Sequence, residues 1–300
     1  MLMIDFSTCP IDSFRMYGGG NGHKIGILYE GATYMLKFPP KEKTRVHYTN
    51  ASLSEYLACH ICEILGIEAQ ETLYGIYRVQ EKEKKVVACR DFTGDGIRLM
   101  EFAKVKNACI GGSSESSSGY ATELDAVLEA IERQTLIDPI ALKQHFWDMF
   151  IVDAYLGNFD RHNGNWGILI NEERRTARIA PIYDCGSCLY PQMPEEKMTE
   201  ILRDPREVDN RVYVFPTSAL KYNGQKINYF EFLFSHVNHD CTAALQRIHP
   251  RIHQEKIDEF IESRAFLSDI QKEFYRRMLR ARKEKILDVA LERIEHGSTR

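Results

Sequence analysis

The amino-acid sequence predicts an α+β protein with two lobes, a small antiparallel β lobe that holds one helix and a larger, mainly helical lobe. Short apolar runs of strand type and a single helical pattern alternate between residues 24 and 89. Beyond that segment, apolar residues recur mostly at helical spacing. The composition changes near residue 92, so we expect the lobes to span residues 1–92 and 93–300.

Composition narrows the class of partner. The 300 residues are 44% hydrophobic, which fits a globular chain with a real core, and the net charge of −4 favours neither nucleic acid nor an anionic membrane. No apolar run approaches the roughly 20 residues of a membrane span. The first ten residues do not have the pattern of a signal peptide. We therefore expect a cytoplasmic location, with secretion by a signal-less route left open.

The β lobe begins with a glycine cluster at residues 17–24. Glycine-rich backbone can approach phosphate groups closely, although such clusters are also common in ordinary loops. Strand-like runs at 24–29 and 33–38, separated by Glu30-Gly31, predict a hairpin directly after the cluster. The candidate phosphate-binding residues are therefore Gly18, Gly19, Gly20, Asn21 and Gly22.

Lys37 stands in the second of these strands, which is otherwise apolar. A helix predicted over residues 51–65, with Gly66 as its stop, places Glu55 one turn from its start. We expect Lys37 and Glu55 to pair. Two alternatives remain for Glu55: a capping box with Ser52, or a position above Cys59 and Cys62 on the same helix face.

Strands predicted at 71–79 and 85–89 complete the sheet. The second of them runs out into a loop at residues 89–92, the position at which a kinase binds the adenine base through its backbone. The candidate nucleotide-binding residues here are Cys89, Arg90 and Phe92, on position alone.

The larger lobe opens with a low-complexity loop at residues 111–119, whose five serines are either autophosphorylation sites or part of a plain flexible insertion. Helices follow at 123–134 and at 138–156, the latter with Asp138-Pro139 as its start and Gly157 as its stop. It is apolar nearly all round, so we expect it to be buried. Further helices are predicted at 229–237, 254–263 and 267–295, with the basic residues of the last on a solvated face.

Polar residues cluster directly after the buried helix. Asp160 is followed five residues later by Asn165, and two apolar runs joined by a polar turn lead to Asp184-Cys-Gly. A hairpin of those runs would bring the three side chains together, where their oxygens suit Mg²⁺. This spacing is that of the catalytic loop and metal aspartate of kinases, with Asp160 as base and Asn165 and Asp184 as metal ligands. The alternative is a hairpin whose Asp and Asn residues only form turns.

Eight cysteines include two C-x-x-C pairs, Cys59 with Cys62 and Cys185 with Cys188. A four-cysteine zinc site and a redox pair are both conceivable from this pattern. The long gap between the pairs, and the helical setting of the first, favour reduced cysteines that pack as small apolar residues.

With these motifs in place, the chain resembles the HipA-like kinases along nearly its whole length. The resemblance is densest at Lys37-Phe-Pro-Pro40, Tyr48-Thr-Asn50, Ser54-Glu-Tyr56, Phe146-Trp-Asp-Met149, 156–167 and 179–191. It implies a protein-kinase-like fold and transfer of phosphate from ATP, with Mg²⁺, to serine or threonine of a protein, including the kinase itself. In this resemblance Asp160 is the catalytic base, Asn165 and Asp184 are the metal ligands, and Lys37 and the glycine loop bind the phosphates. Glu55 and His162 are further candidates for nucleotide binding.

Three points qualify this interpretation. Only about seventeen residues precede the glycine loop, so the sequence does not support an antitoxin partner bound through an N-terminal subdomain. The Arg-His-Asn that follows Asp160 also resembles phosphoinositide kinases, which leaves a lipid kinase as an alternative. A non-catalytic nucleotide-binding module of the same fold is the third hypothesis.

Overall fold

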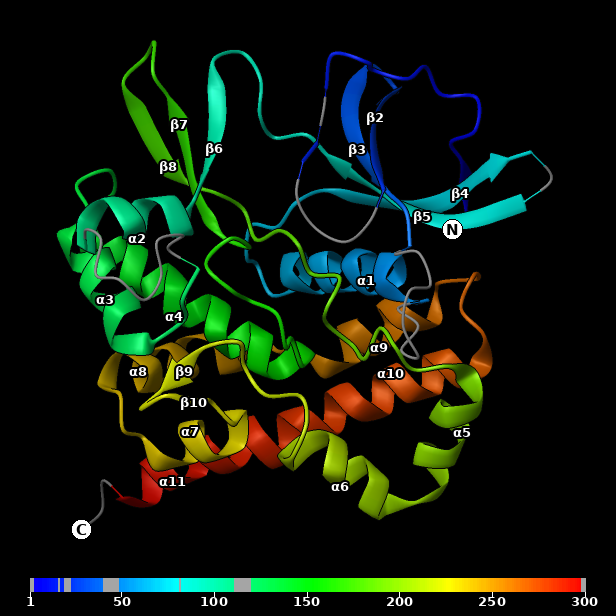
Figure 1. Ribbon diagram of the computed structural model, residues 1–300. Coiled ribbons are helices and arrows are strands. Elements are labelled where there is room, and N and C mark those ends of the chain that lie inside the picture. Colours follow the sequence, from blue (N-terminus) through cyan, green and yellow to red (C-terminus); the bar gives the residue numbers. More distant parts are fainter. Residues whose placement is uncertain are drawn as a thin grey trace.

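Five strands at the N-terminal end of the computed structural model form one twisted sheet in the order β1-β4-β5-β3-β2 (Figure 1). The structure describes residues 3–15, 17–18, 23–39, 49–80, 82–110 and 120–297. The strands of this sheet are β1 (Ile4–Asp5), β2 (Lys24–Tyr29), β3 (Ala32–Lys37), β4 (Thr72–Val79) and β5 (Lys82–Arg90). The sheet is mixed, because β1 pairs with β4 in parallel. The expectation of a purely antiparallel sheet was wrong, since a strand of two residues has no alternation to detect.

Helix α1 (Ala51–Ile64) packs against one face of the sheet through β4 and β5. Its side chains Leu53, Leu57 and Ile61 are buried there. Phe6, from the segment after β1, joins the small apolar cluster on the other face. The sheet is thus covered on both faces, which holds β3 and α1 in a fixed relation.

A second sheet has the order β6-β7-β8 and stands beside the first (Figure 1). Its strands are β6 (Ile97–Glu101), β7 (Gly167–Asn171) and β8 (Thr176–Ile179). The hairpin expected from the apolar runs at 166–170 and 179–183 is present, but its second strand is β8, which ends at Ile179 where the second run begins. Pro181 explains the early end, because proline cannot donate to the ladder. Strand β6 was not predicted.

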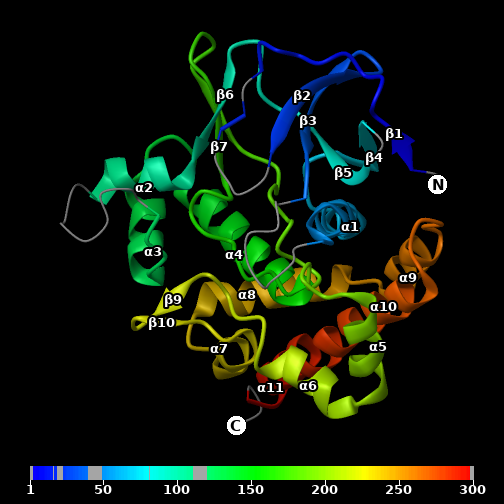
Figure 2. The same ribbon diagram turned by 45° about the vertical axis from the view of Figure 1, so that its right-hand side comes forward.

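The remaining elements, apart from one short hairpin, are helices that lie below both sheets (Figures 1 and 2). They are α2 (Phe102–Ile110), α3 (Leu124–Arg133), α4 (Pro139–Leu156), α5 (Glu195–Arg203), α6 (Pro205–Tyr213), α7 (Tyr229–Ser235), α8 (His239–Ile248), α9 (Gln254–Glu262), α10 (Asp269–Arg282) and α11 (Val289–Gly297). A 3₁₀ turn (His249–Arg251) follows α8, a π-helical segment (Lys283–Asp288) joins α10 to α11, and a short hairpin pairs β9 (Lys221–Tyr222) with β10 (Gln225–Lys226).

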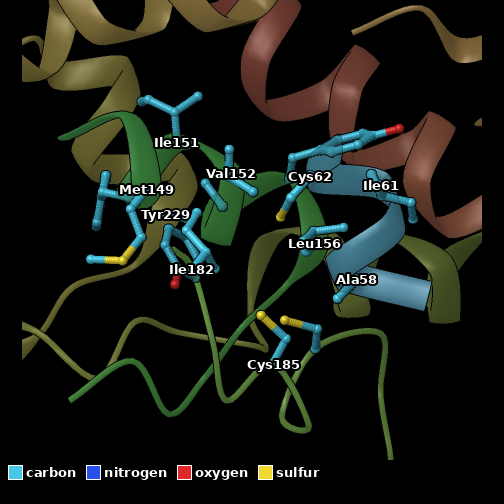
Figure 3. Close-up of a cluster of buried hydrophobic side chains, with 14 of the residues drawn as sticks. Ala58, Ile61, Cys62, Met149, Ile151, Val152, Leu156, Ile182, Cys185 and Tyr229 are labelled. Carbon is cyan, nitrogen blue, oxygen red and sulfur yellow. The ribbon is translucent and has the colours of Figure 1, made fainter. Parts of the chain in front are cut away.

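Helix α4 is the centre of this helical part, as its composition predicted. Asp138 caps its first turn by accepting from the N–H of Ala141 at 3.1 Å, and Pro139 occupies the first position. Gly157 ends it in the left-handed conformation with φ of 68°. Side chains from α1, α4 and the segment after β8 meet in one apolar cluster (Figure 3). Those labelled in Figure 3 are Ala58, Ile61, Cys62, Met149, Ile151, Val152, Leu156, Ile182, Cys185 and Tyr229.

One basic residue of the C-terminal helices departs from the expected solvated face. Arg282 is fully buried at the end of α10, where its guanidinium donates to the carbonyl of Ala154 at 2.8 Å and to that of Arg211 at 3.1 Å. The helix is therefore tied by hydrogen bonds to α4 and α6. Among the described residues, no helix is both long and apolar enough to cross a membrane.

Candidate active site

The loop after α4 presents Asp160 through a chain of hydrogen bonds. Asn158 donates through Nδ2 to Asp153 Oδ1 at 2.8 Å, and its own Oδ1 accepts from the N–H of Asp160 at 3.0 Å. Asn165 donates through Nδ2 to the carbonyl of Asp160 at 2.8 Å. These bonds hold the loop closed, with the Asp160 side chain exposed to solvent.

Arg161 points into the interior and links this loop to the segment that carries Asp184. Its guanidinium forms a bidentate pair with buried Asp153, with Nε to Oδ2 at 3.0 Å and Nη2 to Oδ1 at 3.2 Å. It also donates to the carbonyls of Asn165 and Tyr183 and, at 3.4 Å, to Cys185 Sγ. The Arg161 side chain therefore connects the backbone of Asn165 with the backbone that directly precedes Asp184, and these are the two expected metal ligands. No role for Arg161 was apparent from the sequence.

Asp184 lies where the chain leaves the β7–β8 hairpin and has φ of 55°, a left-handed conformation that Asp tolerates better than most residues. Lys37 Nζ lies 3.1 Å from Asp184 Oδ1 and 3.0 Å from Glu55 Oε2. The Lys37–Glu55 pairing expected from the sequence is thus present in the structure, and it joins β3, α1 and the Asp184 segment.

The capping-box alternative for Glu55 is excluded by this geometry, whereas a position close to the cysteines is compatible with the lysine pairing. The N-cap of α1 is Asn50, and no side chain caps that end. The second carboxylate oxygen of Glu55 accepts from the N–H of Cys185 at 3.1 Å. Gly186 belongs to the same contact, because a Cβ there would stand 3.2 Å from Glu55 Oε2. Glu55 therefore fixes both Lys37 and the backbone next to Asp184.

The charges at the site act on one another. The positive charge of Lys37 is the main cause that lowers the pKa of Asp184 to about 2. Burial disfavours the charge on Lys37, but Asp184 and Glu55 outweigh it and raise the pKa of Lys37 well above its usual value. Lys37 and Asp184 thus remain charged at neutral pH.

Asp160 has a different environment. Desolvation raises its pKa above the ordinary value for Asp, while the positive charge of Lys226 acts in the opposite direction. Lys226 is exposed on the β9–β10 hairpin, more than sixty positions along the chain from Asp160.

Lys24 is a second basic residue whose place at the site was not predicted. It pairs in register with Lys37 across the β2–β3 hairpin, and its charge helps to lower the pKa of Asp184. A signal for it was present in the sequence. A two-residue turn at Glu30-Gly31 sets the register of the hairpin, and that register places Lys24 opposite Lys37.

The three residues expected to bind the adenine base differ in whether their backbone groups already have hydrogen-bond partners. The N–H of Arg90 donates to Glu71 at 2.8 Å, and its carbonyl accepts from Gln70 at 2.9 Å. Cys89 is buried within β5. In the described part of the chain the backbone of Phe92 has no such partner, and its ring lies 5.8 Å from that of Tyr183. Of the three candidates, Phe92 is the one whose backbone can bind a base.

Of the remaining candidate residues, the structure describes Gly18 and His162. Gly18 is exposed, and a Cβ added there would have no heavy atom within 4 Å, whereas Gly19, Gly20, Asn21 and Gly22 lie outside the described residues. His162 Nδ1 accepts from the N–H of Gly164 at 3.0 Å, and its ring lies 5.7 Å from that of Tyr120. This geometry supports the turn between Asp160 and Asn165.

All eight cysteines are free thiols, and both C-x-x-C pairs are buried. The pairs belong to one buried cluster, where hydrogen bonds from Cys188 and Cys59, together with the Arg161 guanidinium, lower the pKa of Cys185 well below its usual value. Within the described ranges, no three His, Cys, Asp or Glu side chains are arranged to hold a metal ion. The cysteines instead form part of the core that anchors the Asp184 segment.

The donors near Asp184 fit a hard cation that is completed by substrate oxygens. Asp184 offers a carboxylate that is 42% exposed, and Asn165 keeps its Oδ1 for another partner because its Nδ2 is engaged by Asp160. Oxygen donors of this kind suit Mg²⁺, which usually takes one or two carboxylates plus phosphate and water.

Phosphoryl transfer needs a base for the acceptor hydroxyl, oxygen ligands for a metal ion and a lysine that can bind phosphate. Residues that suit each of these requirements lie together here, so the fold and the site place the chain among the kinases. More particularly, the chain belongs to the HipA-like family, since the family model described as "HipA-like C-terminal domain" matches residues 17–264.

The relatives agree with this assignment. The serine/threonine-protein kinase CtkA of Helicobacter pylori strain J99 is 48% identical over 293 residues, which are 97% of this chain and 88% of the relative. The crystal structure of the H. pylori proinflammatory kinase CtkA matches with a TM-score of 0.92 at 47% identity, over 99% of both chains. The predicted serine/threonine kinase activity is confirmed by this similarity, and the lipid kinase and the non-catalytic module are not favoured.

A more distant structure shows the fold alone. HipA of Shewanella oneidensis MR-1, solved with HipB and its operator DNA, matches with a TM-score of 0.57 at 17% identity. The match covers 93% of this chain and 66% of that HipA chain. The mixed α and β architecture expected from the sequence is thus found in both relatives.

Proposed function

We propose that this kinase binds Mg-ATP between two lobes, at residues 1–92 and 93–300, and transfers its γ-phosphate to a serine or threonine hydroxyl of a protein, itself included. The observation that carries the proposal is the position of Lys37, within 3.1 Å of both Glu55 and Asp184 carboxylate oxygens. A lysine so held can bind phosphate oxygens, and the aspartate would hold a metal ion that neutralises their charge.

Each side chain then has a task. Asp160 orients the acceptor hydroxyl and accepts its proton, and the glycine loop, Lys37 and Lys24 bind phosphate oxygens. Asn165 and Asp184 hold Mg²⁺, which when bound neutralises charge on the phosphate groups. The backbone of Phe92 contacts the base. Catalysis in this scheme consists mainly of positioning and charge neutralisation.

A phosphate-transfer assay read by mass spectrometry tests the proposal directly. Incubation with ATP and Mg²⁺ should add phosphate to serine or threonine of an added protein mixture, of the kinase, or of both. Phosphate on the serines between residues 113 and 118 would favour autophosphorylation of that segment over a plain insertion, the two alternatives that the sequence left open. Transfer to phosphoinositide vesicles instead of protein would contradict the proposal.

Replacing Asp184 should uncouple nucleotide binding from the metal. We expect Asp184→Asn to weaken ATP binding by about tenfold or more in the presence of Mg²⁺, because the carboxylate is the charged ligand. The affinity without Mg²⁺ should change little or rise, since the variant also removes a negative charge near the phosphates. Titration calorimetry with and without Mg²⁺ measures both affinities. An equal Mg²⁺ effect in the variant and the wild type would remove Asp184 from metal binding.

The pH dependence of transfer should report the charge on Lys226. A nearby positive charge lowers the pKa of a carboxyl, so Lys226→Ala should raise the pKa of Asp160. The base must be deprotonated, and activity should therefore be lost at a higher pH as the solution is acidified, by less than about one unit. The rate–pH profile of the variant gives the shift. Lys221→Ala, exposed on the same hairpin, is the control and should leave the acidic limb in place.

A further inference from the structure

Two phenylalanines next to the candidate base pack against each other and outside the core. Phe159 directly precedes Asp160, and its ring centroid lies 5.7 Å from that of Phe215. Neither residue belongs to any of the three apolar clusters formed by the described residues. Phe215 is 38% exposed, and its neighbour Val214 is 64% exposed. Apolar side chains thus remain in contact with water beside the loop that presents Asp160.

The segment that carries Phe215 is held firmly against this loop. The N–H groups of Val214 and Phe215 both donate to the carbonyl of Asn210 at 3.1 Å, which closes the last turn of α6. Pro216 lies beside Gly157, where an added Cβ would stand 3.0 Å from its Cγ. The exposed apolar surface therefore belongs to a structured segment at a defined place next to the site.

The position of this surface relative to Asp160 restricts what can cover it. An acceptor hydroxyl must come within hydrogen-bond reach of the Asp160 carboxylate. Consecutive residues of an extended peptide are about 3.3 Å apart, so residues one or two positions from the acceptor lie within about 7 Å of it. Phe159 is the residue next to Asp160, and the Phe215 ring centroid lies 5.7 Å from that of Phe159. A flanking side chain of the acceptor would reach this pair.

We propose that Phe159, Phe215 and Val214 form an apolar subsite that receives a large apolar side chain one or two positions from the phosphorylated serine or threonine. This inference rests on the proposed function and specifies its substrate class. The occupant is an extended protein segment with an apolar residue next to the acceptor. Burying a leucine or phenylalanine side chain on such a surface suffices for a preference of about tenfold in kcat/KM.

A positional peptide library with one fixed serine or threonine tests the subsite. Wild-type kinase, ATP and Mg²⁺ should phosphorylate peptides with Leu, Ile, Met or Phe at one flanking position about tenfold better than those with Ser or Asp there. Phe215→Ser should remove that preference. Phe215→Lys and Val214→Lys should change it toward Asp or Glu, a gain that loss of structure would not produce. ATP affinity by calorimetry serves as the folding check.

Ile140→Ser is the matched control. Ile140 is also a large exposed apolar residue, at 74%, but it lies at the opposite end of α4, about 24 Å from the catalytic loop at about 1.5 Å per residue. Its variant should keep the wild-type preference. Two results would overturn the subsite: the same preference in wild type and Phe215→Ser, or a wild-type preference that is not apolar at any flanking position.

Membrane binding or dimer formation through this surface would give different experimental results. Binding to anionic vesicles, or dimer formation in sedimentation, that is lost in Phe215→Ser while peptide preference stays unchanged would also overturn the proposal. A wild-type chain that binds ATP but transfers no phosphate to any peptide or to itself would refute the proposed function, and the subsite with it. Transfer without flanking preference refutes the subsite alone.

Discussion

Asp160→Asn is expected to lower the rate of phosphate transfer by about 10²- to 10⁴-fold while ATP still binds. The amide cannot accept the proton of the acceptor hydroxyl, yet it has nearly the same size as the carboxylate. The contacts that hold the loop use the backbone of Asp160, namely its N–H to Asn158 and its carbonyl to Asn165, so they survive the change.

The measurement is the initial rate of phosphate incorporation, with ATP affinity by calorimetry as the check on the fold. Asp125→Asn, a change of the same kind in the first turn of α3, is the control and should retain the wild-type rate. A rate for Asp160→Asn within a few-fold of wild type would assign the base to another group. Loss of ATP binding would indicate instead that Asp160 organises the nucleotide site.

The second large effect concerns stability. Asp153→Asn removes one half of the buried pair with Arg161 and leaves the guanidinium charge without its partner, so we expect a loss of about 3–5 kcal/mol in the free energy of unfolding. Activity should fall too, because Arg161 also holds the carbonyls of Asn165 and Tyr183 beside the metal ligands.

Urea unfolding followed by fluorescence measures this change. The double variant Asp153→Leu with Arg161→Met should be less destabilised than Asp153→Asn, since apolar replacement of both partners removes the uncompensated charge. Glu200→Gln breaks the exposed pair with Lys197 and should have little effect. If Asp153→Asn proved as harmless as Glu200→Gln, the pair would not be the link between the two loops.

Much of the fold follows from local patterns. The start of α4 at Asp138-Pro139 and its end at Gly157 were predicted, because caps and stops act within a few residues. The β2–β3 hairpin followed from its turn. Strands β1 and β6 escaped detection, since each is stabilised by a partner that is distant in sequence.

The sequence by itself was enough to propose Asp160, Asn165, Asp184, Lys37 and Glu55 as site residues. The interval from Asp160 to Asn165 and the hairpin that leads to Asp184 are local features, and Lys37 and Glu55 follow from adjacent elements. Their spacing is readable because each motif is set by backbone geometry over a few residues.

Only the tertiary structure decided how these residues are supported. It placed Arg161 inside the protein against Asp153, brought Lys226 near Asp160 and set Phe215 against Phe159. It also buried Arg282, which its helix alone would have left in water. Such contacts join segments far apart in the chain, and they depend on the packing of whole elements around α4, which no local pattern encodes.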